Sequence, residues 1–424
     1  MNKKLVALAV AGVLGAPLAQ AQTANVTLYG RVNLDVEFVN GKIYNNNVQQ
    51  PATCNKTLNQ GNCITTNPTV FRESTNSSRF GLRGTESLGG GLNAIFQIES
   101  SVNPAQSGGT LAGRESYVGL QGGWGTFKLG RFLTPYDDIH PIFGNVPTLT
   151  TSILSTASLW AQGFLSTNTG GFDDRVASSV RYDSPNLSGF NFEIQYGQQG
   201  TNYADPGTTI KTPTVNNAKI ISAAAFYNNG PVSLGVAYTG NNGVRGRQTV
   251  LPPPVTCNPP AGVGCSLTGG TLKDYAFSVA GAYSFSVVRV GAVYELLKYD
   301  NGGVAGGDLK RNMWGVSLTG NLGPGQLYGY YGQANNVTGS APDYARVGGM
   351  VKGPDSRATQ YEVSYTYPFS KRTLTYVGYN RINNRNNAAY NFNINPYNPT
   401  ANDASYNTPG GKPGGLVFGL VHFF

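Results

Sequence analysis

The chain has 424 residues, and only 12% of them are charged, about half the share in an ordinary soluble domain. Lys and Arg number 30 against 21 Asp and Glu, but they are spread along the chain and form no cluster, which argues against a nucleic-acid-binding protein. After the N-terminal segment no apolar run is long enough for a membrane-spanning helix. We also expect no bound cofactor or metal.

Residues 1–21 have the pattern of a cleaved secretory signal peptide. Two lysines precede an apolar run at 5–18, and the motif AQA at 19–21 is a small-x-small cleavage site. The run is shorter than the roughly 20 residues of a transmembrane helix. We therefore expect a mature chain of 22–424, starting at Gln22. Without the two lysines, 28 basic residues face 21 acidic ones, so its net charge is about +7.

Segment 26–38 alternates strictly between apolar and polar residues. Its even positions, from Val26 to Phe38, are apolar or Gly, whereas the odd positions include Arg31, Asp35 and Glu37. Period-two alternation puts one set on each face of a strand. The same pattern returns at 190–196, 288–292 and 361–367. A soluble β-sandwich also alternates, but many segments of about 10 residues with charges on the polar face favour a transmembrane barrel.

The connections between these segments alternate between short and long, which is typical of outer-membrane barrels. Seven tight turns and eight long polar loops predict an all-β, antiparallel barrel of about sixteen strands, with the first and last strands paired. Gly (57) and Tyr (25) suit tight turns and aromatic girdles. The turns fall near 87–90, 121–123, 185–188, 228–230, 284–287, 322–325 and 368–371, and the loops near 40–77, 102–112, 133–173, 200–217, 241–271, 300–309, 337–356 and 383–411.

The third loop, about 133–173, combines acidic and apolar residues. It carries Asp137 and Asp138 together with large side chains such as Phe143 and Trp160. A loop exposed only to water has little reason to hold these side chains, so we expect it to fold into the barrel. Packing on neighbouring loops is the alternative.

The four cysteines form two close pairs, Cys54 with Cys63 and Cys257 with Cys265. A signal peptide implies an oxidising compartment, where disulfides persist. The spacing does not fit a zinc site. We predict one disulfide within each of the two loops.

Several ordered motifs extend this interpretation to a family. They are VTLYG at 26–30, SRFGLRGTE at 78–86, LGGGL at 88–92, RESYVG at 114–119, GTFKLGR at 125–131 and GLVHFF at 419–424. The chain resembles the trimeric general porins of Gram-negative outer membranes, in the betaproteobacterial branch. The resemblance implies a homotrimer of sixteen-stranded barrels, embedded among outer-membrane lipids and lipopolysaccharide, with loop three narrowing each pore. It also implies that the terminal Phe424 is read by the insertion machinery.

In anion-preferring members of that family, three wall arginines face loop three, and the resemblance matches them to Arg79, Arg114 and Arg175. Alternation independently places Arg79 and Arg175 opposite the apolar set. Arg114 shares its parity with apolar residues, so a bulge or a later strand start must be allowed. The remaining candidates for the constriction are Arg83, Arg131 and Arg181 on the wall, with Asp137 and Asp138 on the loop. Long first and eighth loops and the cysteine pairs depart from the family pattern.

The expected function is passive diffusion of small hydrophilic solutes and ions, with a weak preference for anions. The alternative for the arginines is simple pairing with Glu37, Glu99 or Glu193. Alternative functions are a substrate-selective porin or a barrel whose loops bind other surfaces. An outer-membrane hydrolase is disfavoured, because the two histidines, His140 and His422, have no nucleophile motif beside them.

Overall fold

The computed structural model describes residues 25–44, 63–145, 152–162, 171–198, 219–243, 273–300, 307–347, 349–397 and 409–424. The predicted signal peptide, Gln22, Cys54, Cys257 and Cys265 lie outside the described residues. Cys63 is disulfide-bonded, and the pairing of the four cysteines stays a prediction.

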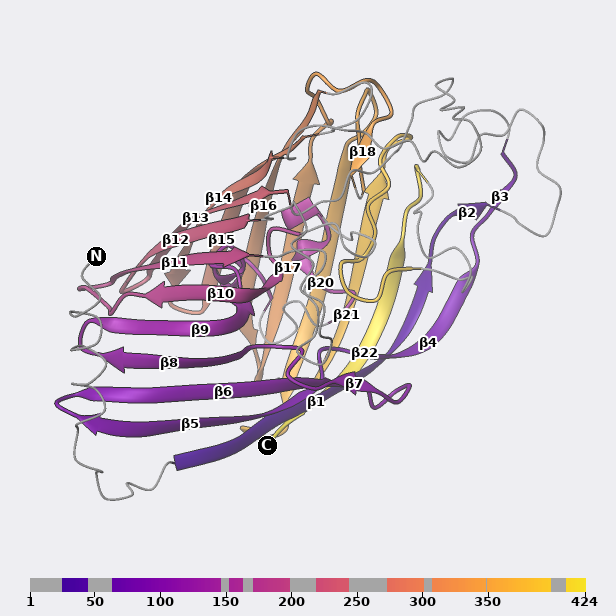
Figure 1. Ribbon diagram of the computed structural model, residues 1–424. Coiled ribbons are helices and arrows are strands. Elements are labelled where there is room, and N and C mark those ends of the chain that lie inside the picture. Colours follow the sequence, from indigo (N-terminus) through magenta and orange to yellow (C-terminus); the bar gives the residue numbers. More distant parts are fainter. Residues whose placement is uncertain are drawn as a thin grey trace, which may run out of the picture.

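The described strands form one closed antiparallel barrel of sixteen wall strands, as predicted (Figure 1). Two wall strands are interrupted and carry two labels each: β4 and β5 both pair with β1, while β7 and β8 both pair with β6. The wall runs β1 (Asn25–Asn40), β4 (Thr69–Thr75) with β5 (Arg79–Gly89), β6 (Leu92–Val102), β7 (Gly109–Thr110) with β8 (Ser116–Gly122), β9 (Gly125–Leu133), β10 (Arg175–Asp183), β11 (Phe190–Gln198), β12 (Lys219–Asn229), β13 (Val232–Asn242), β14 (Lys273–Phe285), β15 (Val288–Asp300), β16 (Asp308–Leu322), β17 (Gly325–Ala334), β20 (Ala358–Pro368), β21 (Thr373–Asn384) and β22 (Gly414–Phe423).

Two short hairpins lie outside the wall, in its long loops. They are β2 (Ile43–Tyr44) with β3 (Thr65–Thr66), and β18 (Arg346–Val347) with β19 (Met350–Val351). Because outer-membrane barrels have short periplasmic turns and longer external loops, the end of the wall with the tight turns is the periplasmic one.

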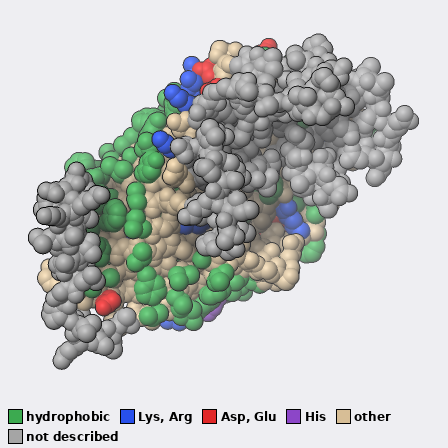
Figure 2. Space-filling view, in the orientation of Figure 1, with side chains coloured by type: hydrophobic (Ala, Val, Ile, Leu, Met, Phe, Trp, Pro, Cys, Tyr) green, Lys and Arg blue, Asp and Glu red, His purple; other side chains and the backbone are tan. Residues whose placement is uncertain are grey.

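The alternation of the sequence becomes an outer apolar face and an inner polar face. In β1, Val26 and Leu28 are more than half exposed, whereas Asn33 and Glu37 are fully buried. Figure 2 shows hydrophobic side chains spread over the outer surface of the strands. Among the described residues, no helix combines the length and apolar character that crossing a membrane would require. The strands thus meet lipid with their apolar side and line the interior with their polar side.

The barrel closes where β1 meets β22. Their register runs from Arg31 opposite Phe423 to Asn40 opposite Gly414, so the predicted pairing of first and last strands is confirmed. At the periplasmic end, the Gly30 amide donates to the Phe424 carbonyl at 3.0 Å and the Phe424 amide donates to the Gly30 carbonyl at 3.1 Å. The last residue is therefore tied to the first wall strand.

Gly30 leaves room for the ring of Phe424. A Cβ atom at position 30 would lie 2.4 Å from Cζ of Phe424 and 2.5 Å from the carbonyl oxygen of Arg79. We expect Gly30→Ala to destabilise the barrel by about 1–3 kcal/mol, because backbone on the neighbouring strand cannot yield as a side chain can. The measurement is the temperature at which the purified barrel loses its compact form in electrophoresis.

Gly329→Ala is the matched control for this substitution. At position 329, also on the outer side of the wall, the nearest atom to an added Cβ is 3.9 Å away. The control should unfold at the wild-type temperature. Equal behaviour of the two variants would contradict the close approach at the seam.

Candidate pore constriction

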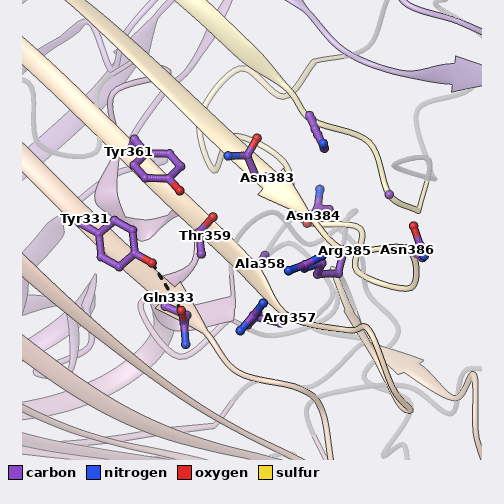
Figure 3. A pocket seen from close by; sticks show the side chains of 12 residues that line it. Tyr331, Gln333, Arg357, Ala358, Thr359, Tyr361, Asn383, Asn384, Arg385 and Asn386 are labelled. Atoms are coloured by element: carbon purple, nitrogen blue, oxygen red, sulfur yellow. Dashed lines mark hydrogen bonds between the residues drawn. The ribbon is translucent and has the colours of Figure 1, made fainter.

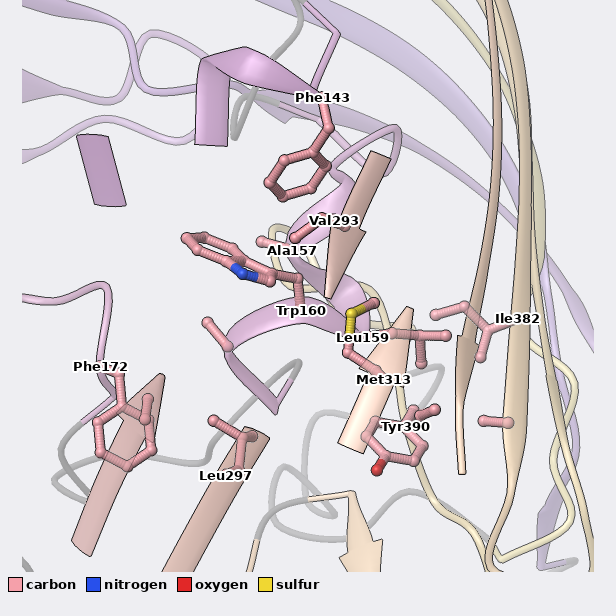
Figure 4. Packing of buried hydrophobic residues seen from close by; sticks show 14 of the residues in the cluster. Phe143, Ala157, Leu159, Trp160, Phe172, Val293, Leu297, Met313, Ile382 and Tyr390 are labelled. Carbon is pink, nitrogen blue, oxygen red and sulfur yellow. The ribbon is translucent and has the colours of Figure 1, made fainter. Parts of the chain in front are cut away.

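The third loop, which connects β9 to β10, folds into the barrel as predicted. Its short helical turns are η1 (Asp137–Ile142), η2 (Thr156–Ser158) and η3 (Trp160–Gln162). The ring of Trp160 is fully buried and stacks on Tyr136 with centroids 5.1 Å apart. Figure 4 shows Trp160 and Leu159 packed toward wall residues that include Val293, Leu297 and Met313. The apolar residues of this loop thus fill one side of the interior.

Glycines on the inner wall make room for this loop. A Cβ at Gly235 would lie 2.7 Å from Cδ1 of Ile142, and one at Gly378 would lie 2.8 Å from Cδ1 of Leu154. Gly415 on β22 gives the same room to Ile153. Packing at interior density leaves no slack for an added carbon. The glycines that the composition suggested for turns therefore also shape the inner surface.

A buried ion pair fixes the loop to the wall. Glu295 of β15 and Arg311 of β16 form an ion pair whose side chains are both fully buried. The Glu295 carboxylate also accepts hydrogen bonds from the Tyr136 hydroxyl at 2.6 Å and the Ala161 amide at 2.7 Å. The Arg311 guanidinium donates to the Leu159 carbonyl at 2.7 Å. Both charges are thus neutralised by each other and by the loop.

Further hydrogen bonds extend this attachment along the wall. The Trp160 indole donates to Ser278 of β14 at 3.1 Å, and Tyr328 of β17 donates to the Phe143 carbonyl at 2.7 Å. Gln360 of β20 donates to the Ser155 carbonyl at 3.0 Å. The loop therefore covers the inner side of β13–β17 and β20–β22, and β1 with β5–β10 form the opposite side of the interior.

The wall on that other side carries an arginine group, which we call the Arg79 cluster: Arg31, Arg79 and Arg114 with Glu99. The Glu99 carboxylate lies 2.5 Å from Nε of Arg114 and 3.3 Å from Nε of Arg79. It also accepts a hydrogen bond from the Tyr29 hydroxyl at 3.0 Å. Among the described residues, Glu99 is the one carboxylate within ion-pair distance of Arg79 and Arg114, and none lies within that distance of Arg31.

Arg31 was not among the predicted site residues. The register of β1 and β5 puts it directly opposite Arg79, and its guanidinium donates to the carbonyls of Ser77 and Asn76. Like charges directly opposite each other destabilise a sheet. Such a pair is therefore expected at a functional site and not at a position that only stabilises the fold. Alternation placed Arg31 on the polar face, but its closeness to Arg79 needs the strand register, which the sequence does not show.

Arg114 lies in irregular chain between β7 and β8, since β8 begins at Ser116. The later strand start that we allowed for is thus present, and parity does not apply to Arg114. Arg83 also points inward, with its guanidinium 5.0 Å from the ring centre of Tyr29. Arg83 and Arg114 thus extend the basic part of the inner wall on either side of Glu99.

Arg181 belongs to a separate group in which acids predominate. Its guanidinium lies 2.7 Å from Asp138, 2.6 Å from Asp183 and 2.9 Å from Glu193. Lys128 of β9 adds a second cation, 2.5 Å from Asp183. With three carboxylates for two cations, this group fits the alternative of simple pairing. Arg181 faces loop three through Asp138, and its positive charge is matched by these carboxylates.

Arg175 and Arg131 lie near the external end of β9 and β10. Arg175 opens β10 within electrostatic range of Arg114, Glu115 and Asp137, and no described residue accepts a hydrogen bond from its buried Nε. A bulge between Val176 and Ser179 shifts the register behind it. Arg131 shares its parity on β9 with the outward Phe127 and Leu129, so alternation separates it from the Arg79 cluster.

The two histidines lie apart and have no catalytic partners among the described residues. His140 is fully buried in loop three, 2.5 Å from the Thr156 hydroxyl, and burial lowers its pKa to about 3. His422 lies on the outer face of β22, 2.9 Å from the Thr373 hydroxyl. The geometry is that of a lumen with fixed charges. A transmembrane barrel that an inward loop narrows beside a charged wall is a channel protein.

Comparisons with known proteins agree with this class. A family model described as Gram-negative porin matches residues 6–387. The chain is 28% identical to an outer membrane porin protein of Bordetella pertussis, covering 89% of this chain and 93% of the relative. It is 31% identical to the major outer membrane protein P.IB of Neisseria sicca, covering 89% and 92%.

Solved structures show the same fold. The anion-selective porin from Comamonas acidovorans superposes with a TM-score of 0.66 at 22% identity, covering 95% of this chain and 100% of that one. The chain belongs to the Gram-negative porin family. It is a passive diffusion channel of the bacterial outer membrane, and family and fold are those of a non-enzymatic pore.

Proposed function

We propose that this porin conducts small hydrophilic solutes and ions with a weak preference for anions, set by the Arg79 cluster. The carrying observation is a group of three arginines in which Arg79 and Arg114 share the carboxylate of Glu99 and Arg31 lies opposite Arg79 in the strand register. An excess of fixed positive charge beside a narrow aqueous path raises the local concentration of anions. A unit charge about 4 Å from an ion contributes about 1 kcal/mol even in water, against an RT of about 0.6 kcal/mol, so several-fold selectivity is within reach.

Other charges make this preference weak. Glu115 and Asp137 lie near Arg175, and the Arg181 group carries more acids than bases. The Comamonas relative is described as anion-selective, which supports the same direction for this chain. Glu37 is paired with Arg72 outside the Arg79 cluster at 2.5 Å, so it does not cancel the charge of the three arginines.

The direct test is the reversal potential of single channels in a gradient of KCl. We expect a sign that corresponds to chloride preference in dilute salt. The preference should fade near 1 M salt, where the Debye length is about 3 Å. A reversal potential on the potassium side at all concentrations would refute the proposal.

The preference should depend on pH through Asp137 of loop three. Burial, with repulsion from Asp138, raises the pKa of Asp137 to about 8, although Arg175 acts in the opposite direction. Below that pH the carboxyl is neutral, and above it a negative charge appears beside the pore. We expect the chloride preference to fall as the pH rises from about 6.5 to 9.5, measured as the reversal potential at fixed salt.

Asp137→Asn should remove this pH dependence, whereas Asp343→Asn, in the exposed seventh loop, should retain it. A wild-type reversal potential that stays constant across the range would contradict the assignment to Asp137.

The proposal also covers the processing and assembly of the protein. We infer a homotrimer in contact with outer-membrane lipids and lipopolysaccharide, after removal of residues 1–21, with Phe424 acting in assembly. Backbone pairing of Phe424 with Gly30 supports the last point. N-terminal sequencing, cross-linking of purified protein and the membrane level of a chain lacking Phe424 test the three parts separately.

A further inference from the structure

A cavity of about 680 Å³ lies on the outside of the barrel, at the external ends of β17, β20 and β21 (Figure 3). Tyr331 of β17, Tyr361 of β20 and Asn383 of β21 line it. All three have the outward parity of their strands, since their neighbours Tyr330, Gln360, Glu362, Ile382 and Asn384 are buried on the inner side. The cavity therefore opens mainly on the outer side of the wall, and it reaches the strand ends at Ala358 and Asn384, whose parity is inward.

Three cations surround the upper part of this cavity. Arg357 precedes β20, Arg385 follows β21 and Lys412 precedes β22. No carboxylate of the described residues lies within ion-pair distance of any of them, and the exposed Asp355, two residues from Arg357, forms no ion pair with it. The site thus holds three positive charges with no described partner.

The backbone around these cations is firmly held. The Arg385 amide donates to the Arg357 carbonyl at 2.9 Å, which joins two of the three segments. The Gly410 amide donates to the Ala388 carbonyl at 2.9 Å and so holds the segment that carries Lys412 beside them. Asn387 adds a hydrogen bond to the Pro354 carbonyl at 2.6 Å. The cations therefore converge on a formed site.

The place of this site on the outer wall indicates the chemical class of its ligand. Tyrosine rings at the boundary of an apolar face mark the level of lipid headgroups, and Tyr361 lies above the exposed Val363 on β20. Arginines just outside such a ring suit phosphate, which they bind with strong charge-assisted hydrogen bonds. We propose that the cavity binds the phosphate headgroup of an anionic outer-leaflet lipid of the lipid A class, whose acyl chains run along β20.

This inference rests on the outer-membrane location in the proposed function, but not on ion selectivity. The test uses the full-length porin in nanodiscs of phosphatidylcholine with increasing amounts of fluorescent lipid A carrying two phosphates. Each basic residue near a lipid headgroup contributes a several-fold factor to affinity. We expect Arg357→Gln with Arg385→Gln to weaken lipid A binding by about tenfold or more, while conductance and reversal potential stay at wild-type values.

Lys219→Gln with Lys273→Gln is the matched control. Both lysines are exposed at the external ends of β12 and β14, away from the cavity, so this pair removes the same charge and should change affinity less than about threefold. Equal weakening in both double variants would reduce the effect to general surface charge and overturn the site. No weakening in either would also overturn it.

Competition with inorganic phosphate tests whether the cavity binds a lipid headgroup or a free phosphate ion. Millimolar phosphate should leave lipid A bound, because free phosphate lacks the contribution of acyl chains along the wall. Displacement of lipid A by phosphate at equal concentration would assign the cavity to soluble anions instead. If the double arginine variant does not assemble, Lys412→Gln changes a loop position and gives the same readout. A changed reversal potential with unchanged lipid binding would count against the lipid site alone.

Discussion

Replacing Arg79 and Arg114 together by glutamine should lower the ratio of chloride to potassium permeability by about threefold or more in dilute KCl. Both side chains share the Glu99 carboxylate, so the variant leaves this acidic charge without an ion-pair partner and Arg31 as the one arginine of the cluster. The loss of two positive charges near the pore should still change ion permeability, because water and dilute salt screen their field only in part at these distances. The measurement is the single-channel reversal potential in a tenfold gradient, repeated at molar salt, where the difference should shrink.

Glu99→Gln provides the test of opposite sign. It removes the carboxylate but keeps a side chain of the same size, so Arg79 and Arg114 lose the ion-pair partner that they share. The net positive charge of the cluster increases, and chloride preference should rise. Arg372→Gln, in the exposed periplasmic turn before β21, is the control for loss of an arginine elsewhere and should leave the ratio unchanged. If Glu99→Gln and the double arginine variant move the reversal potential in the same direction, the cluster does not set the field.

Glu295→Gln should release loop three from the wall. The substitution leaves Arg311 as a buried, uncompensated charge, which costs about 3–5 kcal/mol in a protein interior. Glutamine also weakens the hydrogen bonds that Glu295 accepts from Tyr136 and Ala161. We expect a lower unfolding temperature, larger and noisier single-channel currents and weaker chloride preference, since the loop no longer confines ions to the arginine side.

The double variant Glu295→Leu with Arg311→Leu separates charge from packing. Replacing a buried ion pair by apolar side chains is often neutral or stabilising, so the double variant should recover much of the lost thermal stability. Its currents should be quieter than those of Glu295→Gln. If the single and double variants are equally unstable, the loop is held by packing around Trp160, and the ion pair is not its main anchor.

Much of the fold could be predicted from the sequence because barrel strands are read locally. Alternation in segments such as 26–38 shows which side chains face lipid, and turn residues separate the strands. The inward loop was also predictable, since residues such as Trp160 are too apolar for a loop in water. These features depend on neighbours in the chain, so one sequence is enough to show them.

The constriction was harder to predict because it depends on register and on irregular backbone. The Arg31–Arg79 pair arises from β1 lying against β5 with those two residues opposite each other. Arg114 lies outside regular strand, and the bulge in β10 changes the register beside Arg175. Glu295 and Arg311 lie more than a hundred residues from the loop they hold. No periodicity in the sequence reports such distances.

The seam between Gly30 and Phe424 has a consequence for how the chain folds. Nearly all other wall strands pair with neighbours that follow closely in sequence, so their hairpins can form early and locally. The β1–β22 pairing joins opposite ends of the chain. The entropic cost of bringing these ends together arises before any hydrogen bond between the two strands can form. Until that moment both edge strands expose unpaired backbone groups, which invite association with other chains. Pairing of β1 with β22 should therefore be the last and decisive step of folding. If this step is slow, we expect more aggregated protein and no accumulation of partly formed pores.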